Sequence, residues 1–378
     1  MSMGPLEGLS IIEFAGIGPG PLAGTFLGDL GADVIRIDRP QGGPPLGADG
    51  ALSRNRRSIG LNLKDPRGVE LALTLVAKAD GLFEPFRPGV MERLGLGPDV
   101  CLARNPRLVY GRMTGWGQDG PLANAAGHDI NYIAITGALH AMGEADRPPF
   151  PPLNLVGDFG GGGLLLAYGM VCALFSASRT GRGQVVDAAM VDGAASLMSM
   201  IYGVYARGQW SNVRGSNALA GAAHYYGCYE CADGKYVAFG SIEPQFYAIL
   251  REKLGLTDAV FGEQHVPERW PEFKAHIGAI IKTKTRDEWS AIFEGTDVCY
   301  GPVLDLAEAP LHPHNVARGT FIDVAGELQP APSPRFSGTP APTPRPKSPD
   351  CSDTEAVLLA AGLSAGDYAA LKANGVVA

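Results

Sequence analysis

The sequence predicts an α/β protein with an open parallel sheet, followed by a smaller α+β domain. Short β-rich runs alternate with helical patterns through residues 1–200. Residues 205–320 differ, since "YECADGKYVAFG" places two strands around a turn and a helix follows. The 52 glycines and 30 prolines indicate many loops, which argues against a helical bundle.

The first strand and helix come at the start of the chain. "LSIIEFAG" (9–16) is a short β-rich run, and the helix expected at 19–32 has Pro21 in its first turn and Gly31 at its end. "DVIRID" (33–38) is a second strand. A strand, a helix and a strand in this order predict a right-handed parallel unit.

The remaining elements continue this alternation. A helix is expected at 67–80, and "GLFEPF" and "RLVYGRMTG" supply further strands. Residues 329–349 read as a proline-rich extended linker, and 325–378 as a return segment with a terminal helix capped by Ser352 or Asp353.

Composition limits the function classes. A formal net charge of −8 argues against a general nucleic-acid binder. Cys228 and Cys231 form a CxxC without a second pair, so no metal site is expected, and the six scattered cysteines favour free thiols. The apolar run at 159–176 reads as a buried helix, so no membrane span is expected. We find no export signal, which makes a cytoplasmic location the expectation.

The first βα turn partly fits a dinucleotide fingerprint. "GPGPLA" follows the first strand, and Asp38 ends the second. However, Pro19 and Pro21 remove amide donors that a pyrophosphate would use, and Arg39 directly follows Asp38. The pattern therefore does not support a nicotinamide dehydrogenase.

A basic cluster points to a different ligand. "SRNRRSIGLNLK" brings Arg54, Arg56, Arg57 and Lys64 together in an acidic protein. Guanidinium groups pair with phosphates through two parallel hydrogen bonds. Together with the basic residues Arg39, Arg87 and Arg93, the group favours an anionic ligand with several phosphates; each arginine alone is as well explained by a solvated charged face.

Long motifs along the chain carry a family resemblance. They include "LGDLGADVIRIDRP", "RPGVMERLGLGP", "GHDINY", "NLVGDFGGGG" and "GRGQVVDAAMVDG". By these motifs the sequence resembles the α-methylacyl-CoA racemases of the family III CoA-transferase superfamily. The resemblance implies a Rossmann-like large domain built from both chain ends, a small domain between them, and an interlocked homodimer.

The resemblance also implies where an acyl-CoA thioester is held; coenzyme A is then part of the substrate, and no separate cofactor is expected. Pro85 departs from the small residue expected before the aromatic. The implied coenzyme A positions are Arg39, Leu61, Asn62, Leu63, Lys64, Pro85, Phe86, Arg87, Arg93, Gly127, Asp129, Ile130, Asn131 and Tyr132.

Three residues match the catalytic positions of the racemases: His128, Asp158 and Glu243. Inversion at the carbon next to a thioester carbonyl requires two groups on opposite faces, each able to take or give a proton. Imidazole suits this role near neutral pH, and a carboxyl needs a raised pKa. We expect His128 and Asp158 to be the pair, with Glu243 orienting the histidine.

Other residues have supporting roles in this hypothesis. Asp158 is expected at the N-terminus of a helix, with its own backbone N–H as the oxyanion donor. Met190, Met198 and Met200 are candidates for an acyl-chain surface, although core packing explains each equally well. Asp129 is expected to serve structure rather than proton transfer, because neighbours on a helix point in different directions.

Two other functions stay open. A family III CoA-transferase would use Asp158 as a nucleophile and form an acyl-enzyme anhydride. Such transferases commonly carry a non-basic residue at the position of His128. A catalytically silent acyl-CoA-binding protein is the third possibility, and the presence of all three candidate groups counts against it.

Overall fold

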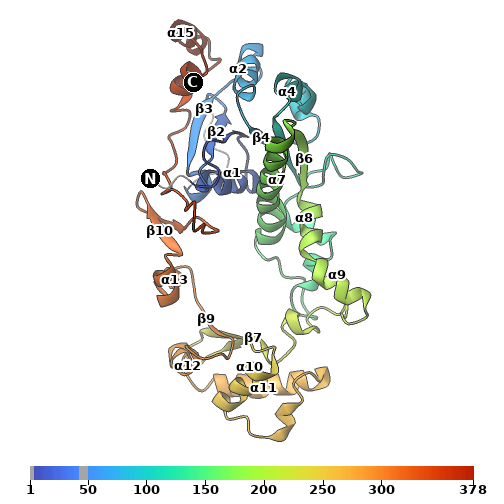
Figure 1. Cartoon of the computed structure of the whole chain (residues 1–378). Helices are drawn as coiled ribbons and strands as arrows, with labels where there is room; N and C mark the ends of the chain where they lie inside the picture. Colours follow the sequence, from blue (N-terminus) through green and yellow to red (C-terminus); the bar gives the residue numbers. More distant parts are fainter. Residues whose placement is uncertain (1–3, 42–49) are drawn as a thin grey trace. The chain divides into compact units, whose positions relative to one another are not determined.

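The computed structural model describes residues 4–41 and 50–378, and they form two compact units (Figure 1). The first unit comprises the described residues of Met1–Ala138, with Pro152–Ser199 and Gly319–Ala378. The second comprises Leu139–Pro151 and Met200–Arg318. Leu139–Pro151 thus belongs to the second unit, although the sequence analysis included it in the large domain.

A parallel sheet of six strands is the centre of the first unit. Its spatial order is β3-β2-β1-β4-β5-β6, and every described pairing in it is parallel, which confirms the predicted α/β fold. The strands are β1 (Ser10–Phe14), β2 (Asp33–Asp38), β3 (Arg56–Gly60), β4 (Gly81–Glu84), β5 (Val109–Thr114) and β6 (Gln184–Ala189).

Helices cover both faces of this sheet. Alternate residues of β1 point to opposite faces, so Ile11 packs in one apolar cluster and Ile12 in the other. The helices around the sheet are α1 (Pro19–Asp29), α2 (Pro66–Val76), α3 (Val90–Arg93), α4 (Pro98–Arg104), α5 (Asp129–Ala134), α7 (Leu165–Thr180), α8 (Met190–Leu197), α14 (Thr354–Ala360) and α15 (Ala365–Ala373).

Local chemistry fixes where these helices begin. Pro19 and Pro66 occupy the first turns of α1 and α2, where the missing N–H costs no helical hydrogen bond. Asp65 caps α2 by accepting the N–H of Arg67 at 2.9 Å. At the other end of the chain, Asp353 precedes α14, but its carboxylate accepts the N–H of Ser58 on β3 at 2.9 Å. Asp353 therefore occupies the expected N-cap position of α14, but its side chain makes no cap hydrogen bond, because a strand donor takes its carboxylate.

The proline-rich return segment is tied to the sheet edge. Asn55 exchanges two hydrogen bonds with Arg345, and the Ser348 hydroxyl donates to the carbonyl of Arg56 at 2.9 Å. The segment follows the hairpin of β10 (Phe321–Val324) and β11 (Glu327–Pro330). It carries the chain to α14, whose Val357 and Leu358 complete the core on one face of the sheet.

The apolar run predicted as one buried helix forms two helical segments. Leu155–Leu164 is a π-helix, η2, and α7 continues it. One face of α7 packs on the sheet through residues such as Leu166 and Met170. The other face is exposed, so this helix is only half buried in the chain. The exposed large side chains of α7 are Tyr168, Val171 and Phe175, and Leu164 at the end of η2 is exposed as well. By length and composition alone, Leu155–Thr180 could also cross a membrane.

The second unit has its own sheet and core. β7 (Tyr226–Glu230), β8 (Tyr236–Gly240) and β9 (Tyr300–Val303) form an antiparallel sheet in the order β7-β8-β9. Its longer helices are α9 (Ser199–Ala206), which begins at the end of the first unit, α10 (Pro244–Leu254), α11 (Trp270–Ile281) and α12 (Arg286–Phe293). An aromatic core that includes Phe239, Phe273 and Phe293 holds these elements together.

Candidate active site

The predicted site residues of the first unit gather at the carboxyl edge of the parallel sheet. From β1 the next strands are added on one side of the sheet as far as β3, and from β4 they are added on the other side. The topological switch point therefore lies between the parallel strands β1 and β4, and ligands of open α/β sheets bind outside the carboxyl ends of the strands at such a point. The turns after these two strands touch, since a Cβ on Gly16 would lie 2.3 Å from Pro85. Gly16 therefore explains how a proline is accommodated at position 85.

The "GHDINY" turn follows β5 and leads into α5. His128 is the residue before the helix, and its backbone N–H donates to the side chain of Asn131 at 3.1 Å. The Tyr132 hydroxyl donates to the carbonyl of Gly127, and the Tyr132 ring makes an edge contact with Trp116 at 4.8 Å. These contacts close the turn on itself, so the exposed His128 side chain extends from a well-packed backbone.

Asp158 lies in the first turn of η2, next to the β1–α1 turn. A Cβ on Gly18 would lie 3.4 Å from its Oδ2 atom, and the amide of Asn154 approaches the same oxygen at 3.5 Å. Burial raises the pKa of Asp158, and the negative charge of Asp129 raises it further; Asn154 and His128 oppose the shift. His128 is thus close enough to Asp158 to influence its pKa, and their role as a catalytic pair stays a prediction.

Asp129 is buried between α5 and η2. Its Oδ2 atom accepts the backbone N–H groups of Gly157 and Asp158, both at 2.7 Å. The N–H of Asp158 is therefore already bonded, and its expected role as the oxyanion donor is wrong. A local sequence argument could not find this contact, because Asp129 and Asp158 are 29 residues apart.

Glu243 lies in the second unit. It directly precedes α10, and its side chain is exposed. The backbone before it is held by hydrogen bonds from Ser241 N to the carbonyl of Tyr225 at 2.9 Å and from Gln264 Nε2 to the carbonyl of Ile242 at 2.9 Å. The Glu243 carboxylate also contributes to the raised pKa of Cys299.

The expected coenzyme A positions fall at the ends of successive strands. Arg39 follows β2, residues 61–64 follow β3, and residues 85–87 follow β4. The charged side chains of Lys64, Arg39, Arg87 and Arg93 are exposed at this edge. The Leu61 side chain, in contrast, is only 1% exposed and packs in the core, so it offers a ligand only its backbone.

Most of the predicted basic cluster is not available to a ligand. Arg54 pairs with Asp29 at 2.5 Å, Arg56 pairs with Glu13 at 3.0 Å, and Arg57 pairs with Asp33. The Arg54 and Arg56 side chains are buried. The interpretation of these three arginines as phosphate ligands is wrong, because carboxylates of β1, α1 and β2 already neutralise them. Met190 likewise packs in the core rather than on an acyl-chain surface.

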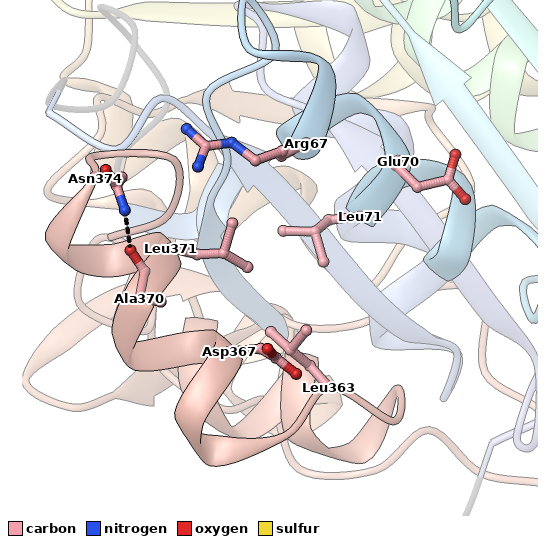
Figure 2. A pocket seen from close by; sticks show the side chains of 8 residues that line it. All are labelled: Arg67, Glu70, Leu71, Leu363, Asp367, Ala370, Leu371 and Asn374. Atoms are coloured by element: carbon pink, nitrogen blue, oxygen red, sulfur yellow. Dashed lines mark hydrogen bonds between the residues drawn. The ribbon is translucent and has the colours of Figure 1, made fainter.

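One surface groove lies away from these residues. It has a volume of about 390 Å³ and lies between α2 and α15, where Figure 2 shows Leu71 and Leu371 facing each other. Its lining includes none of the predicted catalytic or coenzyme A positions. Within residues 4–41 and 50–378, no group of three or more His, Cys, Asp or Glu side chains could hold a metal ion.

Comparison with known proteins identifies the family of the chain. A model of CoA-transferase family III matches residues 6–354. The chain belongs to CoA-transferase family III. It is 46% identical to the alpha-methylacyl-CoA racemase of Mus musculus, over 89% of this chain and 87% of the relative. It is 32% identical to an acetyl-CoA:oxalate CoA-transferase of Acetobacter aceti, over 94% and 95%.

A solved structure supports the same family. A CAIB/BAIF family protein from Brucella suis is similar with a TM-score of 0.82 and 28% identity, over 96% of this chain and all (100%) of that one. The family III match spans the whole second unit and extends into the first unit on both sides of it, as far as residue 354.

Sequence reasoning about this family III chain missed two contributors to the site. Gly18 and Asn154 both border the Asp158 carboxyl, but neither was singled out. Gly18, the second glycine of "GIGPGP", has φ +63 and precedes α1. Because glycine adopts positive φ more readily than other residues, a glycine at this position could have indicated a turn next to the site. Asn154 carried no such signal.

Proposed function

We propose that this protein is an isomerase that epimerises 2-methylacyl-CoA thioesters at the α carbon. The observation that supports the proposal is the partly buried Asp158 carboxyl at the β1–α1 turn, whose Oδ2 atom would lie 3.4 Å from a Cβ on Gly18 and whose pKa is raised by burial and by Asp129. A carboxyl with a raised pKa can give a proton as well as take one, which a two-base reaction requires of both partners. The 46% identity to a mouse alpha-methylacyl-CoA racemase supports the same reaction.

The reaction moves one proton. In one direction neutral His128 takes the α proton, and the electrons of the C–H bond form an enolate whose charge lies on the thioester oxygen. Protonated Asp158 then gives a proton to the opposite face of the same carbon. The reverse direction exchanges the two roles, so each turnover leaves the pair in the opposite protonation state. Glu243 is proposed to orient the imidazole and stabilise its charged form.

The first turn of α5 is proposed to stabilise the enolate. The N–H groups of Asn131 and Tyr132 donate to the carbonyl of His128. Those of Asp129 and Ile130 precede the first helical bond, so the helix itself gives them no acceptor. A thioester oxygen next to His128 would meet these two donors, and one oxyanion donor is typically worth about 3 kcal/mol.

Coenzyme A is proposed to be part of the substrate, with no further cofactor. The exposed cations Arg39, Lys64, Arg87 and Arg93 stand at the carboxyl edge of the sheet, where its phosphates would lie. The acyl chain then extends toward His128 and Asp158 from the turns after β4 and β5.

A CoA-transferase is the second candidate. Asp158 is only partly buried, and an accessible carboxylate could attack a thioester to form an anhydride. The relative from Acetobacter aceti favours this alternative less strongly than the mouse racemase favours the first, with 32% identity against 46%.

One experiment separates the two candidates. A single epimer of a 2-methylacyl-CoA is incubated with the protein in deuterated water. Epimerisation with uptake of deuterium at the α carbon supports the racemase. Transfer of CoA to an added carboxylic acid, with an acyl-enzyme trapped by hydroxylamine, would refute it. His128→Ala should abolish racemisation and leave CoA binding close to that of the unchanged protein.

A homodimer is proposed as the working form. The exposed side chains of Leu164, at the end of η2, and of Tyr168, Val171 and Phe175 on α7 follow the 4-3-4 spacing of one helix face. A second copy of the chain would cover this face, as the interlocked dimer implied by the family resemblance requires. Phe175→Glu should convert the dimer to monomer in light scattering, whereas an unchanged mass would exclude α7 from the interface.

A cytoplasmic location is proposed from the cysteines. All six are free, and Cys172, Cys228 and Cys299 are exposed. Exposed free thiols persist in a reducing compartment. Fractionation of the native host should recover the activity with cytosolic markers, and recovery with a membrane-enclosed organelle would contradict the proposal.

A further inference from the structure

The carboxylate of Asp129 has an unusual environment. The residue is 5% exposed, and its Oδ1 atom has no hydrogen-bond partner among the described residues. No lysine or arginine in the part of the chain that the structure describes forms an ion pair with it. Its Oδ2 atom accepts two backbone N–H groups, from Gly157 and Asp158, at 2.7 Å each.

These two hydrogen bonds hold the first turn of η2. The contact is close enough to require glycine at position 157, since a Cβ there would lie 2.7 Å from Oδ2 and 3.2 Å from the Cα of Asp129. Further along η2, a Cβ on Gly161 would lie 2.6 Å from the backbone of α8. Asp129 at one end and α8 along the side therefore fix the segment that carries Asp158. π-Helical turns are often found at functional sites.

We propose that Asp129 is a positioning residue for Asp158, which it serves by fixing the start of η2 and by placing an unpaired negative charge beside the Asp158 carboxyl. The inference rests on the proposed racemase function, which needs Asp158 as an acid in one direction. A buried charge next to a second carboxyl disfavours ionisation of the latter. Asp129 thus favours the protonated form of Asp158, in agreement with the direction of the Asp158 pKa shift.

Other polar and charged groups near η2 also act on Asp158 or lie on the elements packed against it. His128 and Asn154 act on Asp158 in the opposite direction to Asp129. Tyr132 also interacts with Asp158, and burial raises its pKa to about 12, so it is neutral near pH 7. The charged residues on the elements packed against η2 are Asp29 on α1, Arg179 on α7, Asp192 on α8, Arg112 on β5 and Asp187 on β6.

The test replaces charge while keeping shape. Asp129→Asn retains an oxygen that can accept both amide groups but has no charge. In the pH profile of racemisation, we expect the limb that reports loss of the Asp158 proton to move to lower pH, with KM close to that of the unchanged protein. Each pKa unit of movement lowers the rate about tenfold above that limb. The exposed Asp99→Asn on α4 is the matched control and should leave the profile unchanged.

A second readout does not depend on activity. The carboxyl of Asp158 is titrated by ¹³C NMR in protein labelled at aspartate, and its resonance is assigned with Asp158→Asn. A lower pKa in Asp129→Asn supports the proposal even if the protein fails to racemise, which would refute the proposed function alone. An unchanged Asp158 titration overturns the electrostatic role of Asp129.

The geometric role has its own variant. Gly157→Ala keeps the charge of Asp129 but forces its carboxylate away from the two amides. We expect a lower kcat in a protein that remains folded by circular dichroism. A kcat equal to that of the unchanged protein would overturn the positioning role.

Discussion

Replacing Arg56 by methionine should destabilise the first unit without specifically weakening acyl-CoA binding. The Arg56 and Glu13 side chains are both 1% exposed and form an ion pair at 3.0 Å. The guanidinium also donates to Thr25 Oγ1 at 2.9 Å and to the carbonyls of Pro21 and Arg54. Arg56→Met would remove the guanidinium from all of these acceptors, and among the described residues only the Pro21 carbonyl would keep a side-chain donor, the Thr25 hydroxyl at 2.9 Å.

The expected loss follows from the group left behind. Burial already raises the pKa of Glu13, and Arg56 is the main influence that opposes this shift. Removing one partner of a buried ion pair typically costs about 3–5 kcal/mol, because the other charge stays desolvated. We therefore expect the free energy of unfolding to fall by an amount in that range.

Urea denaturation followed by far-ultraviolet circular dichroism measures the loss. The double variant Glu13→Gln with Arg56→Met should recover part of it, since no uncompensated charge remains. Arg93→Ala is the comparison: it is exposed, so stability should change by less than about 0.5 kcal/mol while KM for acyl-CoA rises. An Arg56→Met protein with unchanged stability and a raised KM would refute the structural assignment and restore Arg56 as a phosphate ligand.

Three further predictions concern packing and pH. Gly193→Ala should lower both stability and kcat, because its Cβ would lie 1.9 Å from the carbonyl of Gly161 in η2. Gly203→Ala, whose Cβ would make only an ordinary contact with Arg207 Nη1 at 3.7 Å, is the control in a thermal melt and a kinetic assay. Burial lowers the pKa of His224 to about 4, so the free energy of unfolding of the second unit should fall by up to about 3 kcal/mol as pH falls from 6.5 toward 4. Unfolding followed by tryptophan fluorescence should show no such loss in His224→Phe. Burial raises the pKa of Glu84 to about 7, so the stability that its protonated form gives the first unit should decline as pH rises from 4.5 through 7. Circular dichroism melts of Glu84→Gln should lack this decline. The same dependence of melting temperature on pH in the variant and the unchanged protein would contradict the assignment.

The sequence predicted the elements whose signals are local. β1, β2, β4 and β5 coincide with the predicted β-rich runs. α1 coincides with the helix predicted at 19–32, and α2 with the helix predicted at 67–80, although α2 ends already at Val76. These signals need only neighbours in the chain. The α/β fold followed from their order, because strands separated by helices pair in parallel.

The errors concern contacts between distant segments. Arg54, Arg56 and Arg57 read as a phosphate site because they are adjacent, yet their carboxylate partners are 25, 43 and 24 residues away. The hydrogen bond from the Asp158 N–H to the Asp129 carboxylate likewise joins two residues that are far apart in the sequence. Charge density along a sequence predicts a ligand only where the fold leaves those charges unpaired. Among the candidate phosphate ligands, the exposed cations are Lys64 at the end of the cluster and the three arginines outside it, Arg39, Arg87 and Arg93.

The environment of Asp158 bears on the choice between proton transfer and nucleophilic attack. A nucleophilic carboxylate has to be ionised, and a basic neighbour without an opposing charge would favour that form. Asp158 instead lies in a partly buried turn beside Asp129, which raises its pKa and favours the protonated form. The same residue would serve either chemistry by geometry alone, since both need a carboxyl next to the thioester carbon. Burial and the charge of Asp129 increase the fraction of Asp158 that is protonated at a given pH and decrease the fraction available as a nucleophilic carboxylate, so the electrostatics of this site favour the racemase.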